Sequence, residues 1–363
     1  MKIRDLIHII EEHAPLSFQE GYDNSGLLIG GFDEEVNKAL ICIDITEDIL
    51  NEAAEKNCDI IISHHPLIFK GLKRITESCP TERIIKKAIK NNIAIYSAHT
   101  NLDNTIYGVS HILAEKLGLK ELKILEPKAE MLSKLVTFCP LSHSNQVRQA
   151  IFDAGGGKIG NYDCCSYNIS GEGSFRALEG TNPYVGEKNK IHFENETRIE
   201  VIFPKYLEDN IVRAMIAAHP YEEVAFDLYP LNNKWNQVGS GVIGNIEPRE
   251  EIDFLMEVKK LTGVKTIKHS KLRNKPVGKV AICGGSGSFL INRALKQKAD
   301  IFITSDIKYH DFMDVDNNMI LADIGHYESE QFSKELIYNV ITKKIPNFAV
   351  LISEINTNPV YYL

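Results

Sequence analysis

Short apolar runs recur along the chain, and each ends abruptly in polar residues. The clearest run, residues 60–62, leads into two adjacent histidines, His64 and His65, and then into a proline that prevents a strand from continuing regularly. Similar runs occupy residues 39–45, 93–97, 277–283, 301–304 and 320–322. Stretches of helical spacing precede or separate the runs, and residues 3–10 are an example. This alternation predicts an α/β fold with a largely parallel sheet.

Histidines and carboxylates follow four of these runs. His64 and His65 directly follow the run at 60–62. The groups that follow the runs at 93–97, 301–304 and 320–322 are His99 with Asp103, Asp306 with His310, and His326 with Glu330. In an open α/β sheet the C-terminal ends of parallel strands line one edge, where ligands bind. The pattern therefore predicts a metal site at one edge of a sheet.

The spacing and type of these residues indicate the kind of metal site. His326 and Glu330 are four residues apart on a predicted helix, so both lie on one helical face. With His64, His65 and Asp103 they supply three imidazoles and two carboxylates, a set that suits two ions sharing bridging carboxylates and water. Such mixed ligands favour zinc, iron, manganese, cobalt or nickel. His99, Asp306 and His310 are then candidates for orienting the ligands or for acid–base chemistry.

The pattern changes after about residue 126. The expected elements from there on are a strand at 131–139, a helix at 145–154, a loop rich in glycine and aromatic residues at 155–186, a strand at 197–203, a helix at 206–218 and a strand at 224–229. This order is typical of a small α+β domain of ferredoxin-like type. We therefore expect a discontinuous α/β domain, residues 1–125 and 236–363, interrupted by an α+β domain at 126–235.

Two polar turns allow more than one interpretation. Asp23 and Asn24 could contact a ligand, but Asp-Asn-Ser-Gly is also ordinary turn chemistry, which we favour. Residues 284–288 are rich in glycine and serine and follow a predicted strand, so they form either an anion-binding nest or a tight strand-to-helix turn. No nucleotide-binding motif of the Walker type and no serine-hydrolase GxSxG motif is present.

Charge and cysteine content restrict the partners and the compartment. The chain has 363 residues and a formal net charge of -8, which argues against broad nucleic-acid binding. Its seven cysteines are odd in number and show no CxxC spacing, which favours reduced thiols. The first residues predict an amphipathic helix rather than a signal peptide, and no segment reaches the ~20 apolar residues that cross a bilayer. We expect a cytoplasmic protein without membrane contact.

Four stretches carry a resemblance to a known family: residues 23–27 (DNSGL), 62–67 (ISHHPL), 97–103 (SAHTNLD) and 325–330 (GHYESE). They resemble the GTP cyclohydrolase 1 type 2 homologues, also called Nif-three-like dinuclear metal proteins. The resemblance implies two divalent metal ions, which would be held by His64, His65, Asp103, His326 and Glu330. It also implies a homohexamer built as a dimer of trimers. Residues 160–162 and 218–225 match the PII/CutA-like middle domain of longer members.

The resemblance leaves the reaction open between two classes of function. The family name implies opening and hydrolysis of the GTP ring by a metal-activated water, with His99 or His310 moving protons. The alternative is a non-enzymatic metal carrier or a regulatory scaffold whose PII-like domain senses a ligand. His219, Tyr221 and Glu222 would form a second small-molecule site or, as we favour, pack within a trimer.

Overall fold

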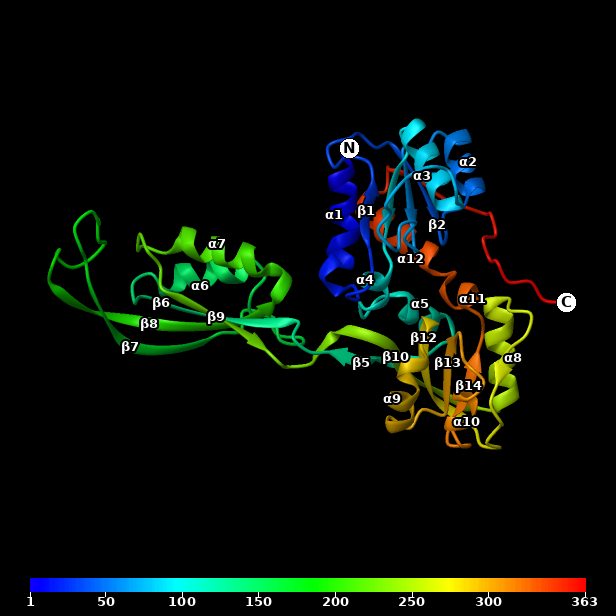
Figure 1. Cartoon of the computed structure of the whole chain (residues 1–363). Helices are drawn as coiled ribbons and strands as arrows, with labels where there is room; N and C mark the ends of the chain where they lie inside the picture. Colours follow the sequence, from blue (N-terminus) through cyan, green and yellow to red (C-terminus); the bar gives the residue numbers. More distant parts are fainter. The chain divides into compact units, whose positions relative to one another are not determined.

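The computed structural model describes residues 1–363 and divides into two compact units (Figure 1). Residues Met1–Pro127 and Asn236–Leu363 form the first, which we call the discontinuous unit. Residues Lys128–Trp235 form the second, the inserted unit. No helix in either unit has the length and apolar character needed to cross a membrane.

The first sheet of the discontinuous unit has the strand order β1-β4-β3-β2-β15. Its strands are β1 (Gly26–Ile29), β2 (Lys38–Cys42), β3 (Ile60–Ser63), β4 (Ala94–Ser97) and β15 (Ala349–Ile352). β15, β2, β3 and β4 run parallel, and β1 pairs antiparallel with β4. The helices that precede or connect these strands are α1 (Ile3–His13), α2 (Glu47–Glu55), α3 (Pro80–Lys90) and α12 (Ser333–Lys344).

A second sheet in the same unit corrects the expectation of one sheet edge. Its order is β11 (Lys268–His269), β14 (Ile320–Asp323), β13 (Ile301–Ser305), β12 (Val277–Ser286), β10 (Trp235–Arg249) and β5 (Lys120–Lys128). β12, β13 and β14 are paired in parallel, whereas β10 pairs antiparallel with β12 and β11 pairs antiparallel with β14. The remaining helices of the unit are α4 (Thr100–Asp103), α5 (Val109–Lys116), α8 (Glu251–Thr262), α9 (Ile291–Lys296), α10 (Asp311–Asp314) and α11 (His326–Glu330). The strands that end in ligand candidates are thus divided between two sheets.

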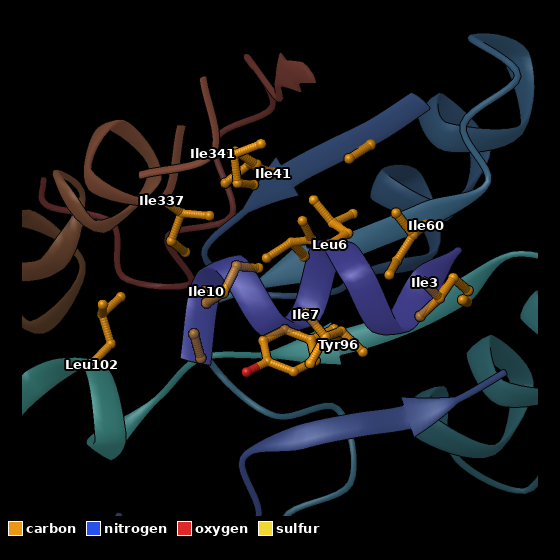
Figure 2. Close-up of a cluster of buried hydrophobic side chains, with 14 of the residues drawn as sticks. Ile3, Leu6, Ile7, Ile10, Ile41, Ile60, Tyr96, Leu102, Ile337 and Ile341 are labelled. Atoms are coloured by element: carbon orange, nitrogen blue, oxygen red, sulfur yellow. The ribbon is translucent and has the colours of Figure 1, made fainter. Parts of the chain in front are cut away.

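Helix α1 covers the first sheet with the apolar face that its sequence predicts. Ile3, Leu6, Ile7 and Ile10 are buried together with Ile41, Ile60 and Tyr96 from the central strands, as Figure 2 shows. Ile337 and Ile341 of α12 complete this cluster. Burying one such isoleucine stabilises a fold by about 1.5–3 kcal/mol. The packing therefore fixes β3 and β4, the strands that lead into the candidate site.

The inserted unit is an antiparallel sheet with two helices packed on one face. The chain order is β6 (Leu132–Pro140), α6 (Ser144–Asp153), β7 (Tyr167–Arg176), β8 (Ile191–Pro204), α7 (Glu208–Ala218) and β9 (Phe226–Leu231). The sheet order β7-β8-β6-β9 is that of a ferredoxin-like arrangement. β7 lies within the stretch that we expected to be only a loop. It is an exposed edge strand, so it lacks the apolar alternation that marks a half-buried one.

Candidate metal centre

Two histidines reach the centre from the first sheet. His64 and His65 directly follow β3, and the His64 ring is fully buried. His64 Nδ1 lies 2.8 Å from the carbonyl oxygen of Ala98, and His65 Nδ1 lies 2.7 Å from Asp44 Oδ1. Because both partners can only accept, each Nδ1 carries a hydrogen and donates it. The Nε2 atom of each ring is therefore the one that faces the centre, as in metal-binding histidines.

The second sheet contributes from the short helix α11, which follows β14. His326 and Glu330 lie on one face of this helix, with His326 Nε2 3.1 Å from Glu330 Oε2. The His326 ring is oriented from behind, since its Nδ1 donates to Asp306 Oδ2 at 2.7 Å. Glu330 is almost completely buried. A buried carboxylate of this kind needs cationic or hydrogen-bonding partners.

The Glu330 carboxylate joins the candidate ligands of the two sheets. Its Oε2 atom lies 2.9 Å from His65 Nε2, and its Oε1 atom lies 3.7 Å from His64 Nε2. Asp103 Oδ1, from α4, also lies 3.7 Å from His64 Nε2. The structure thus brings together all five residues that were predicted as metal ligands.

Two of these atoms lack the partners that buried polar atoms normally have. His64 Nε2 and Asp103 Oδ1 are buried without any hydrogen bond. Their separation of 3.7 Å is too long for a hydrogen bond and close to the ~3.4 Å between two ligands on a tetrahedral metal with bonds of ~2.1 Å. The candidate ligand atoms of His64, His65 and Glu330 all lie within 4.8 Å of one another. This buried group could bind a metal ion.

The pKa shifts within the cluster indicate which side chains carry protons when no cation is bound. Burial alone lowers the pKa of His65, but its hydrogen bonds to Asp44 and Glu330 outweigh burial and raise that pKa to about 10. Burial also acts to lower the pKa of His326, but its interactions with Glu330 and Asp306 outweigh burial and raise that pKa to about 9. Burial acts to raise the pKa of Glu330, yet the neighbouring histidines hold it well below its usual range. Without metal, protons on these histidines therefore balance the Glu330 charge.

His99 lies beside the cluster and is held by Asp23. Its ring centre is 5.4 Å from that of His64 and 5.3 Å from that of His65, and its Nδ1 lies 2.7 Å from Asp23 Oδ1. The Asp23 carboxylate also accepts from the Thr100 backbone at 3.0 Å. Burial acts to raise the pKa of Asp23, but its hydrogen bonds with the His99 ring and the Thr100 hydroxyl hold that pKa below its usual range. Asp23 is therefore more than the turn residue that we favoured, because it orients His99.

Of the remaining residues around the cluster, Asp306 and Asp44 contact candidate ligands and His310 does not. Asp306 contacts His326, whereas His310 is exposed, lies edge-on to Tyr309 and forms no hydrogen bond or ion pair with the cluster. The predicted role of His310 in proton transfer stays a prediction, and no contact with the cluster supports it. Asp44 was not among the candidates, although it ends the apolar run at 39–45 in the way that His64 ends its own. The strand-end pattern could have identified it.

The glycine-rich turn at 284–288 lies against the candidate ligands. Gly285 has φ +66°, and its N–H donates to Ser329 Oγ at 2.9 Å. A Cβ atom at Gly285 would lie 2.1 Å from Glu330 Oε1. Because Ser329 already uses this N–H, the contacts favour a tight turn over an anion-binding nest. Glycine is needed here so that the backbone can approach Glu330 closely.

Replacing Gly285 with alanine is expected to weaken metal binding by about tenfold or more, because the new methyl group displaces the Glu330 carboxylate. Gly118→Ala is the matched control, since Gly118 has a similar φ of +76° but no atom within 4 Å of the added Cβ. Both variants carry the same type of backbone strain, ~1–3 kcal/mol. Titration with zinc against a chelator measures the difference, and equal affinities in the two variants would contradict the role given to Gly285.

The fold and the buried imidazole–carboxylate cluster define a mixed α/β protein with a candidate metal centre. A family model described as Duf34/NIF3 (NGG1p interacting factor 3) matches residues 1–359, and the chain belongs to this family. A relative from Halalkalibacterium halodurans is 37% identical over 99% of this chain and 98% of its own, and one from Bacillus subtilis is 36% identical over the same shares. Both are called GTP cyclohydrolase 1 type 2 homolog.

Solved structures support the assignment of the chain to this family. The crystal structure of a Bacillus cereus protein related to NIF3 matches with a TM-score of 0.87 and 36% identity, over 100% of this chain and 99% of that one. The Staphylococcus aureus protein SA1388 matches with a TM-score of 0.79 and 31% identity over the same shares. The mixed α/β fold with several sheets is therefore that of the family.

Proposed function

We propose that the protein binds two divalent metal ions and is a metal-dependent hydrolase, with GTP as the first candidate substrate. The observation that carries the proposal is the position of Glu330, whose two oxygens face different sets of ligand candidates. His64 and Asp103 would hold one cation and His65 and His326 the other, with Glu330 contributing one oxygen to each. The unpartnered His64 Nε2 and Asp103 Oδ1 support a cation at the first position.

The ligand set restricts the metal and the reaction class. Imidazole with carboxylate suits zinc, iron, manganese, cobalt or nickel. Such cations supply Lewis acidity, which suits hydrolysis of a purine ring, a phosphoester or an amide. The names of the relatives favour GTP among these substrates.

His99 and its neighbours supply the groups that the reaction needs beside the cations. Asp23 holds His99 Nδ1, which leaves Nε2 as the atom that can accept or release a proton. The Phe69 ring lies 6.3 Å from the His99 ring and 6.2 Å from that of Tyr22, and both aromatic side chains are exposed. Exposed aromatic faces beside an acid–base group suit the planar ring of a nucleotide.

The test compares the wild-type protein with a His64→Ala/His65→Ala variant, each isolated without chelator. We expect about two metal ions per chain in the wild type by mass spectrometry and a loss of both in the variant, because each ion loses one imidazole. GTP turnover should fall with the metal content.

The possible results separate the metal site from the enzyme. Metal loss together with loss of turnover supports the hydrolase. Metal in the wild type without turnover of any nucleotide would contradict the hydrolase and leave the metal site standing. No metal in the wild type, even after reconstitution, would overturn the metal site itself.

A pocket in the inserted unit favours a second candidate function, a regulatory scaffold that senses a ligand. The pocket has a volume of about 790 Å³ and lies on the sheet beside β7 and β8. Tyr221 and Glu222 line it, and Tyr221 donates to Glu196 Oε1 at 2.8 Å. Its five glutamates outnumber its two arginines, which suits an amine or another organic cation. His219 does not line the pocket, and its Nε2 instead donates to the Phe138 carbonyl.

The assembly and the compartment are proposed with the function. We infer a homohexamer, a dimer of trimers, in which a PII/CutA-like inserted unit contributes to trimer packing. Exposed Tyr162, Tyr167 and Phe193 on that unit support an interface. All seven cysteines are free, which supports a cytoplasmic location. The net charge disfavours a nucleic-acid partner.

A further inference from the structure

The segment after β15 is anchored to the first sheet before it reaches the metal centre. Ser353 is buried, and its hydroxyl donates to the Glu52 carboxylate. The same hydroxyl accepts from the Ile355 backbone at 3.2 Å, and Lys334 Nζ donates to the Ser353 carbonyl at 3.3 Å. These contacts define the path of residues 353–355, and the chain continues from there along the edge of the centre.

Thr357 completes a chain of hydrogen bonds that ends at His65. Its hydroxyl donates to Asp44 Oδ2 at 2.9 Å, while Asp44 Oδ1 accepts from His65 Nδ1 at 2.7 Å. Each carboxylate oxygen of Asp44 therefore has its own partner. A carboxylate held at both oxygens has lost the freedom to rotate, so it fixes the plane of the histidine that donates to it.

Asn358 contacts the other side of the centre. Its side-chain amide donates to Glu328 Oε1 at 3.0 Å, and Glu328 lies on α11 between His326 and Glu330. Asn358 Oδ1 accepts from the Val360 backbone at 3.0 Å, and its own N–H donates to the Asn356 side chain at 2.9 Å. Two consecutive residues thus join a group behind the first-sheet histidine to the helix from the second sheet.

We propose that residues 353–360 form a strap across the metal centre, in which Thr357 is a positioning residue that sets the His65 ring through Asp44. This inference rests on the proposed metal site. The strap explains how ligands delivered by two separate sheets keep a common geometry. It also predicts that a hydroxyl outside the ligand set controls metal affinity.

Thr357→Val removes the hydroxyl at nearly constant shape, and Thr357→Ser keeps it. Removing a group that directly orients a metal ligand costs ~10–100-fold in affinity. Thr357 contacts His65 only through Asp44, so its removal should have a smaller effect. We expect Thr357→Val to weaken zinc binding by roughly threefold to tenfold and Thr357→Ser to bind like the wild type. Thr342→Val is the matched control, because the Thr342 hydroxyl donates only to the Tyr338 carbonyl within α12. Zinc competition against a chelator, with the full-length metal-free chain, gives the affinities.

A second measurement tests the strap without metal. The ¹⁵N resonances of the His65 ring report its hydrogen bonding, so they should change in Thr357→Val and not in Thr357→Ser or Thr342→Val. Unchanged resonances and affinity in Thr357→Val, while His65→Ala loses zinc, would overturn the strap alone. If the wild type and His65→Ala take up zinc equally, the proposed metal site fails, and the ring resonances still decide whether Thr357 orients His65.

Discussion

Replacing Glu330 with glutamine is expected to abolish binding of both metal ions, whereas Asp103→Asn is expected to abolish only one. The two Glu330 oxygens face different histidines, since Oε2 is 2.9 Å from His65 Nε2 and Oε1 is 3.7 Å from His64 Nε2. Asp103 contacts only the His64 side, at 3.7 Å. Loss of the shared charge therefore removes a ligand from both positions, and loss of Asp103 leaves the position of His65 and His326 intact.

The two substitutions are a matched pair, because each turns a carboxylate into its amide. Metal per chain, measured by mass spectrometry after reconstitution with zinc, should fall from about two to zero in Glu330→Gln and to about one in Asp103→Asn. A full equivalent of metal retained by Glu330→Gln would show that Glu330 does not join two positions. Loss of both ions in Asp103→Asn would assign the bridge to Asp103 instead.

The metal-free protein is expected to lose stability as the pH rises from about 6.5 to about 10. The folded-state pKa of His65, about 10, and that of His326, about 9, both lie above the ordinary value. A raised histidine pKa contributes stability that is fully present below the unfolded pKa and is lost as the pH passes the folded pKa. At ~1.4 kcal/mol per pKa unit, the shift of His65 corresponds to about 4–5 kcal/mol in unfolding free energy, and the partly exposed His326 adds less than its own shift because solvent screens its charge.

Urea unfolding with chelator present, from pH 6.5 to pH 10, measures this loss. A His65→Asn/His326→Asn variant serves as the reference, because lysines and tyrosines that also titrate at high pH are common to both proteins. The difference between the two proteins should shrink as the pH rises. A difference that stays constant over this range would contradict the assigned proton positions. Zinc displaces the same protons, so it should remove most of the loss.

The ligand candidates could be found from the sequence because each of them follows an apolar run. His64 and His65 end β3, and the spacing of His326 and Glu330 is that of one helical face. Local pattern contains this information, since strand ends and helix faces are properties of a few consecutive residues. The structure brings these residues together, and whether they hold two metal ions stays a prediction.

The partition into two sheets could not be predicted in the same way. The runs at 60–62 and 301–304 are both mainly apolar, so their residue types do not show the sheet to which each belongs. Strand pairing depends on contacts between residues far apart in sequence. β7 was missed for a related reason, because an exposed edge strand has no buried face to mark it. His310 lies five residues after the end of β13, but it is exposed beside Tyr309.

The division of the candidate ligands between two sheets has a consequence for biosynthesis. His65 and Glu330 are 265 residues apart, so the candidate ligands of the first sheet are made long before those of the second. A nascent chain can present His64 and His65 but not the shared carboxylate, and its affinity for metal ions should stay low until α11 has been translated and docked. Tight binding would then be restricted to chains in which both sheets have already assembled. Metal binding would then stabilise only chains in which the two sheets are already packed together, and it would oppose their separation.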